Sequence, residues 1–136
     1  MKNLVFFAAL VLVAHGAYSQ TATTPAKTNM AMAAVDNQNY DFGKIKLNVP
    51  ATHKFVFTNT GKVPMVITNA QPSCGCTTPD WTKDPIPPGG QGFVQATYNA
   101  ASVGAFDKKV TVTANVESGV IMLSIRGEVQ AEPIKN

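Results

Sequence analysis

The stretch VTVTANVESGVIMLSIRGEV, residues 110–129, decides the fold class of this chain. Apolar and polar side chains alternate in its first half and again in its second half, after the connection Glu117-Ser118-Gly119. An alternation with a period of two is typical of strands that bury one face and expose the other. The stretch therefore predicts a β-hairpin, with inward-facing Val110, Val112, Ala114 and Val116 in one strand and Ile121, Leu123 and Ile125 in the other.

Shorter segments of the same kind precede the hairpin, at residues 40–42, 51–59, 64–70 and 93–98. Turn-forming residues separate them, in a chain that holds 10 Gly and 9 Pro among 136 residues. The segments and the hairpin make about six or seven strands on roughly 100 residues, and no segment after the N-terminal run has the period of an amphipathic helix. The chain is predicted to be all-β, an immunoglobulin-like β-sandwich of about seven strands.

The first residues predict export. Lys2 is followed by an apolar run from Leu4 to Val13, which is too short to cross a bilayer but has the length of a signal-peptide core. We predict a signal peptide at 1–19, a flexible tether at 20–34 and the sandwich domain at 35–136. Because no cysteine near residue 19 can accept a lipid, the mature protein is expected in the periplasm or extracellular space without insertion into the membrane.

The charge pattern argues against a nucleic-acid partner. The chain carries 11 Lys and Arg and 8 Asp and Glu, a formal net charge of +3. The basic residues are dispersed along the chain, whereas nucleic-acid-binding proteins cluster them on one surface. We therefore expect no nucleic acid among the partners.

Several motifs resemble one bacterial family, catalogued as Domain of Unknown Function 1573. The matching residues are Phe42-Gly43, Phe55-x-Phe57-x-Asn59-x-Gly61-x-x-Pro64, Ser73-Cys74-Gly75-Cys76-Thr77, Pro85-Ile86-x-Pro88-Gly89, Gly104, Val110-x-Val112-x-Ala114-Asn115 and Leu123-x-Ile125-x-Gly127-x-Val129. The resemblance covers residues 40–129, and the Ser-Cys-Gly-Cys-Thr loop makes it specific.

The resemblance implies a fold and a role. That family is similar to the immunoglobulin-like domains of the major-sperm-protein and Hydin type, which implies a seven-stranded sandwich that serves as an envelope or scaffold module. It implies no reaction. One segment departs from the family pattern, because Leu47-Asn48-Val49-Pro50 stands where a glycine-containing turn is expected.

Cys74 and Cys76 are the only cysteines of the chain, and three interpretations of them stay open. They form a disulfide with each other in a ring too small to add much stability, a bond that would be labile and oxidising. Alternatively, the two thiolates bind a soft metal ion with His53, Met65 or Met122, although two cysteines and one mature histidine fall short of a zinc site. In the third interpretation, the loop is a tightly packed structural turn.

The remaining candidates concern binding and not catalysis. We interpret His53 as a hydrogen-bonded residue at the border of a strand, and no hydrolase motif or catalytic carboxylate pair surrounds it, so neither an enzyme activity nor a cofactor is expected. Trp81 either covers the core edge or anchors a partner. The predicted binding loop contains Cys74, Gly75, Cys76 and Trp81.

Two functions are consistent with these features. The first is an exported non-enzymatic module that binds or scaffolds an unidentified envelope protein, through the loop from Pro72 to Trp81 or through pairing at a sheet edge. The alternative is a thiol-redox or copper-handling protein that acts through Cys74 and Cys76.

Overall fold

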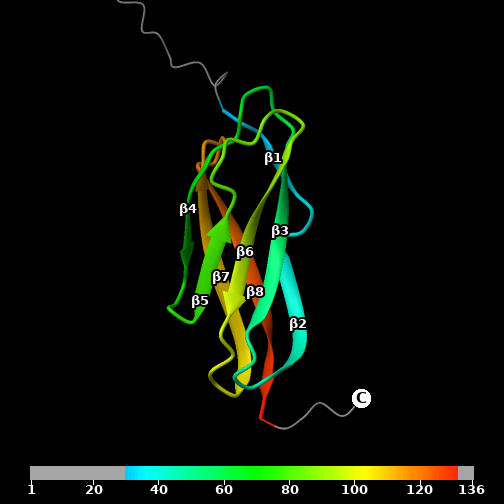
Figure 1. Cartoon of the computed structure of the whole chain (residues 1–136), viewed down its shortest axis with the longest axis vertical. Coiled ribbons are helices and arrows are strands. Elements are labelled where there is room, and N and C mark those ends of the chain that lie inside the picture. The colour runs from blue at the N-terminus through cyan, green and yellow to red at the C-terminus, as the bar shows by residue number, and fades with distance from the viewer. Residues whose placement is uncertain (1–29, 132–136) are drawn as a thin grey trace, which may run out of the picture.

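A computed structural model describes residues 30–131 of the chain (Figure 1). The predicted signal peptide and the predicted tether up to residue 29 lie outside the described residues. Eight strands make up the described part: β1 (Ala33–Val35), β2 (Asn39–Lys46), β3 (Ala51–Asn59), β4 (Ile67–Pro72), β5 (Thr77–Trp81), β6 (Gln91–Tyr98), β7 (Gly104–Ala114) and β8 (Val120–Gln130).

The strands form two four-stranded sheets, in the orders β1-β3-β6-β5 and β2-β8-β7-β4. All neighbours are antiparallel except β2 and β8, which run parallel. In Figure 1 the two described ends of the chain, blue and red, lie at opposite ends of the long axis. The core between the sheets contains the inward residues of each strand, among them Phe55, Phe57, Val94, Val110, Val112, Leu123, Ile125 and Val129.

The hairpin predicted from residues 110–129 is β7 and β8. Thr113 pairs with Val120, and the connection closes with a hydrogen bond of 3.1 Å from the Ala114 amide to the Gly119 carbonyl. Gly119 takes a positive φ of 72°, which glycine adopts without strain. The inward residues of the hairpin are buried as predicted, except Ile121, which is partly buried.

The fold begins before residue 35, the predicted start of the domain. Ala31 is 1% exposed, forms a parallel bridge with Val116, and donates from its amide to the Asn115 carbonyl at 2.9 Å. Gly61 permits this approach, because a Cβ there would lie 2.7 Å from the Met32 amide nitrogen. Residues 31–34, placed in the tether by their composition, are therefore part of the sandwich, and β1 brings the number of strands to eight.

Asn59 ties together the loops that lie next to Ala31. Its side-chain amide donates to the carbonyls of Val63 at 2.8 Å and Ile86 at 2.9 Å, and its Oδ1 accepts from the Gly61 amide at 3.0 Å. The residue is fully buried. The Asn-x-Gly motif is therefore a buried polar clamp between the connection after β3 and the segment before β6.

Candidate functional site

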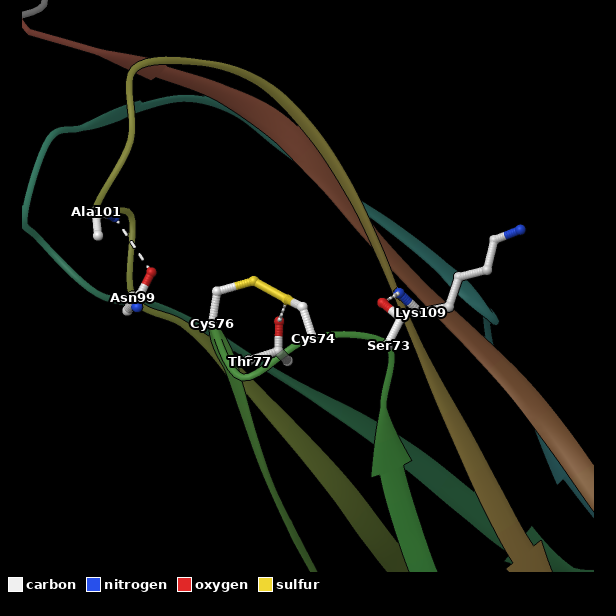
Figure 2. Close-up of a disulfide and its surroundings, with 7 residues drawn as sticks. All are labelled: Ser73, Cys74, Cys76, Thr77, Asn99, Ala101 and Lys109. Carbon is white, nitrogen blue, oxygen red and sulfur yellow. Dashed lines mark hydrogen bonds between the residues drawn. A yellow bond between two sulfur atoms is a disulfide. The ribbon is translucent and has the colours of Figure 1, made fainter.

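The two cysteines lie in the connection between the sheets. Residues 73–76, the cysteine loop, lead from β4 at the edge of one sheet to β5 at the edge of the other. Figure 2 shows a disulfide between Cys74 and Cys76, whose Cα atoms are 5.3 Å apart. Of the described cysteines none is free, so the thiols are consumed by this bond.

Backbone hydrogen bonds anchor the cysteine loop on both sides of the disulfide. The Ser73 amide donates to the Lys109 carbonyl at 2.8 Å, and the Lys109 amide donates to the Ser73 hydroxyl at 3.1 Å. On the other side the Asn99 amide donates to the Cys76 carbonyl at 3.0 Å. The loop is thus fixed to β7 and to the end of β6, and both cysteines stay half-buried.

Thr77 places a hydroxyl beside the disulfide. Its side chain is 3% exposed, and its Oγ1 lies 3.9 Å from the Cys74 Sγ, within hydrogen-bonding range for sulfur (Figure 2). A disulfide sulfur has no proton, so the hydroxyl is the donor of this contact. The first residue of β5 therefore directs a polar group at one sulfur of the pair.

The neighbouring loop explains the departure from the family pattern at residues 47–50. Asn48 has a positive φ of 60°, so it takes the left-handed conformation that favours glycine and that asparagine tolerates best among the other residues. Its amide donates to the carbonyl of Ala100 at 2.9 Å, and Ala100 is also left-handed, with a φ of 52°. The turn forms without a glycine.

Trp81 does not join the predicted binding loop. It ends β5, five residues after Cys76, and the usual rise of a strand separates the two by roughly 16 Å. Its indole Nε1 donates to the Ile67 carbonyl at 3.2 Å, and the Lys83 amine lies 3.0 Å from the ring centroid. Trp81 thus covers the core edge between β4 and β5, while Cys74, Gly75 and Cys76 stay together in the cysteine loop.

The side chains considered as further metal ligands lie apart from the cysteines. His53 stacks on Tyr40 with ring centroids 3.5 Å apart and meets the edge of Phe55, and its partial burial lowers its pKa. Met65 is buried and bridged to Ile86, and Met122 lies on β8. Within residues 30–131, no three His, Cys, Asp or Glu side chains are grouped closely enough to hold a metal ion.

A charged groove crosses the bulge of β2. Asp41 accepts from the Gly43 amide at 2.8 Å and pairs with Arg126 at 3.0 Å. The backbone hydrogen bond, assisted by Arg126, lowers the pKa of Asp41. Asp107 of the same groove accepts from the Ser124 hydroxyl at 3.0 Å, so Asp41, Asp107 and Arg126 each have a hydrogen-bond partner within the fold.

A second groove, of about 560 Å³, is lined by polar and apolar surface in about equal measure, and the sequence did not predict it. It lies between the first described residues and the β7–β8 connection, and we call it the methionine groove. Met32 is 62% exposed, Met122 49% and Val120 47%. Its polar lining residues are Gln38, Glu117 and Ser118, and its apolar ones are Ala31, Met32, Ala33, Val35, Val116, Val120, Ile121 and Met122.

One wall of the methionine groove is an open length of β8. Among residues 30–131, pairing on this side of β8 begins only at Ser124, which is opposite Asn39 in β2 and whose amide donates to the Gln38 carbonyl at 2.8 Å. Alternate residues of a strand direct their backbone groups to the same side. The N–H and C=O of Met122 therefore point to the same side as those of Ser124, above the start of β2 and into the groove.

Two sequence signals of this groove are visible in retrospect. Met122 and Val120 are apolar residues on the outward face of β8, which otherwise carries Ser124, Arg126 and Glu128. Met30-Ala31-Met32 places two large apolar residues in a polar segment. Neither signal specifies a groove alone, because its walls come from residues more than 80 positions apart.

Comparison with known proteins agrees with this architecture. A family model described as protein of unknown function (DUF1573) matches residues 33–129, well over half of the chain. The chain belongs to the DUF1573 family. None of the curated proteins matches this DUF1573 chain.

Solved structures share the fold of this DUF1573 chain at low sequence identity. A protein of unknown function from Porphyromonas gingivalis W83 has a TM-score of 0.67 and 11% identity over 79% of this chain and 51% of its own. The ASH/PapD-like domain of human CEP192 has a TM-score of 0.59 and 10% identity, over 96% of this chain and 100% of that domain. The secreted serine protease VesC from Vibrio cholerae has a TM-score of 0.57 and 16% identity, over 74% and 24%.

These similarities establish the fold. The prediction of an all-β immunoglobulin-like sandwich is confirmed by the two sheets and by the PapD-like neighbour. The DUF1573 chain spans about half of the Porphyromonas protein and a quarter of the protease. Among the residues that the structure describes, no helix has the length and apolar character needed to span a bilayer.

Proposed function

We propose that this protein is an exported, non-enzymatic interaction module of the cell envelope, whose methionine groove binds an extended apolar segment of a partner protein. The observation that carries the proposal is the open length of β8 beside exposed methionine side chains. The groove takes the place of the loop from Pro72 to Trp81, since Trp81 is bonded to Ile67 and lies at the far end of β5.

The side chains of the groove favour an apolar partner. Met32, Val120 and Met122 are each about half exposed or more, so a partner that covers them removes apolar surface from water. Methionine is unbranched and polarisable, which lets a surface adapt to side chains of different shape. The same surface can therefore accept a segment whose apolar residues vary.

The backbone of the groove favours an extended partner. The N–H and C=O of Met122 face the groove, where a strand that continues the line of β2 would form hydrogen bonds with them. Such strand addition combines backbone hydrogen bonds with contacts between alternate side chains. A partner strand here would bury its apolar side chains against Met32 on one wall and Met122 on the other.

The other sheet edges are protected against pairing. β1 has only three residues, β5 contains Pro79, β4 ends at Pro72, and the bulge of β2 lies between Asp41 and Lys44. Proline removes an amide donor, and bulges and lysines on an edge strand discourage the approach of another strand. Pairing with a partner is therefore favoured at the start of β8.

Export is supported by the N-terminal sequence. Lys2 and the apolar run from Leu4 to Val13 have the order of a signal peptide. Residues 20–29 would then connect the processed N-terminus with Met30, which lines a small hollow next to the methionine groove. Fractionation of cells that express the full chain tests export. An exported protein is found in the envelope or the medium, with the mass of a chain that starts near Gln20.

Photocrosslinking in cells tests the groove. A photoreactive residue in place of Val120 is expected to capture a defined envelope protein. The control position is Val103, which is 60% exposed and directly precedes β7, at the end of that strand away from the β7–β8 connection. The same photoreactive residue there should capture little. Met122→Lys should abolish the capture from position 120, and Val103→Lys should leave it intact. In the purified complex, the Met122 amide should gain protection from hydrogen exchange.

Two results would contradict the proposal. Equal capture from positions 120 and 103 would show that the groove has no preference for the partner. A complex in which the Met122 amide exchanges as fast as in the free protein would exclude strand addition.

A further inference from the structure

We infer that the disulfide between Cys74 and Cys76 is a thiol–disulfide exchange site, which accepts two electrons from a dithiol. This inference goes beyond the proposed binding function and concerns another part of the molecule. The cysteine loop follows β4, at one edge of the β2-β8-β7-β4 sheet, whereas the methionine groove adjoins β8 on the side of β2.

The disulfide is not needed to hold the cysteine loop in place. Ser73 is bonded to Lys109 through two hydrogen bonds, and the Cys76 carbonyl accepts from the Asn99 amide. These contacts flank the two sulfurs and involve none of their atoms. The S–S bond can therefore open and close while the ends of the loop stay fixed to β7 and β6, as a reversible exchange requires.

The bond also has little to contribute as a cross-link. Its cysteines are only two positions apart, so it closes a loop close to the smallest possible. The stabilisation that a disulfide provides by restricting the unfolded chain grows with the length of the closed loop. A structural role thus explains the presence of the two cysteines poorly.

Gly75 lies exposed between the two cysteines. A Cβ at this position would meet no atom within 4 Å outside the adjacent Cys74 and Cys76, and its φ is not in the positive range where glycine is favoured. The fold of this domain therefore does not require a glycine here. Both cysteines are half-buried and the glycine between them is exposed, so a thiol of another molecule can approach the cysteine loop from the solvent.

Thr77 distinguishes the two sulfurs. Its hydroxyl, held by a buried side chain, lies 3.9 Å from the Cys74 Sγ and can donate to a thiolate that forms there. Exchange proceeds faster when the departing thiolate is more stable. The geometry therefore makes Cys74 the leaving group and Cys76 the sulfur that is attacked.

The reaction is balanced with a dithiol as co-reactant. Its first thiolate attacks the Cys76 Sγ, the S–S bond breaks, and the electron pair leaves on the Cys74 Sγ, which takes a proton from water. The second thiolate of the dithiol then attacks the other sulfur of the dithiol, which is bound to Cys76 in the mixed disulfide, and releases the Cys76 thiolate, which also takes a proton from water. The dithiol loses two electrons and becomes a disulfide, and the two cysteines become thiols.

The test is a redox titration of the purified mature protein with mixtures of reduced and oxidised dithiothreitol, read by alkylation and mass. Half reduction is expected at a ratio of reduced to oxidised reagent about a hundredfold or more below that for a long-loop structural disulfide of a secreted protein. The circular dichroism spectrum should be the same before and after reduction. Because the reagent is a small dithiol, the result does not depend on the methionine groove.

Variants of Thr77 test the assignment of the leaving group. Thr77→Val keeps the shape of the side chain and removes the hydroxyl, so reduction by dithiothreitol should slow about five- to tenfold, as the loss of one hydrogen bond predicts. Thr77→Ser should restore the rate. The inference is overturned if half reduction of the wild-type protein requires the same ratio of reduced to oxidised dithiothreitol as the long-loop structural disulfide. The leaving-group assignment is overturned if Thr77→Val is reduced at the wild-type rate.

Discussion

Replacement of Asn59 by alanine should destabilise this protein by about 3 kcal/mol, since each hydrogen bond of the side chain contributes about 1 kcal/mol. The change removes the bonds to the carbonyls of Val63 and Ile86 and the bond from the Gly61 amide. Ile86 keeps one partner, because its carbonyl also accepts from the Met65 amide at 2.8 Å. The Val63 carbonyl, in a part-buried site, loses its bond to Asn59. The expected loss of stability is therefore at or above the sum of the three bonds.

Urea denaturation at 25 °C measures this loss, with circular dichroism and the fluorescence of Trp81 as two probes. Trp81 is the single tryptophan and packs at the core edge, so both probes should report one cooperative transition. Asn99→Ala is the matched control, because exposed Asn99 accepts one hydrogen bond, from the Ala101 amide at 3.2 Å. It should cost less than about 1 kcal/mol. Equal losses for the two variants would refute the role of Asn59 as a clamp.

Three further predictions concern protonation, backbone approach and the disulfide. Burial lowers the pKa of His53 below its usual value of 6.5. The contribution of neutral His53 to the free energy of unfolding is therefore complete above pH 6.5 and should be lost as the pH falls from 6.5 through the lowered pKa. His53→Gln should flatten this dependence of the urea midpoint on pH. An unchanged profile would contradict this. Gly127→Ala should cost about 1–3 kcal/mol in the same assay, because its Cβ would lie 2.8 Å from the Gly43 carbonyl oxygen, whereas Gly75→Ala should be neutral. Equal urea midpoints would show that the backbone yields. The double replacement Cys74→Ser, Cys76→Ser should cost less than about 2 kcal/mol, and a larger loss would assign the disulfide a structural role.

The sequence predicted those strands whose side chains alternate. β3, β6, β7 and β8 each bury every second side chain over much of their length, and this local pattern suffices to identify them. β5 was interpreted as a loop because Thr77–Trp81 contains Pro79 and Asp80, which are uncommon in strands. Its conformation is set by pairing with β6, a contact between distant segments that composition does not reveal.

The candidate sites were predicted to different extents for the same reason. The cysteine loop was found because two cysteines at a spacing of two are a local signal. The position of Trp81 was not, because it follows from the length of β5 and from a hydrogen bond to Ile67 in the opposite sheet. The methionine groove requires Met32 and Met122 to face each other, which only the assembled sandwich brings about.

The two proposed sites share one hairpin, and the structure predicts that they act independently. Ser73 is bonded to Lys109, and Lys109 pairs with Ser124, the first residue of β8 that is bonded toward β2. These contacts connect the cysteine loop with the groove. They involve only backbone groups and the Ser73 hydroxyl, and reduction of the disulfide changes none of these groups. A state that differs in no contact to a ligand cannot alter its affinity. The partner captured at Val120 should therefore bind the oxidised and the reduced protein equally, as isothermal titration of both forms measures. If the affinities differ, linkage requires that the partner shift the redox equilibrium of the disulfide by the same factor, and the loop would then not be held as its hydrogen bonds indicate.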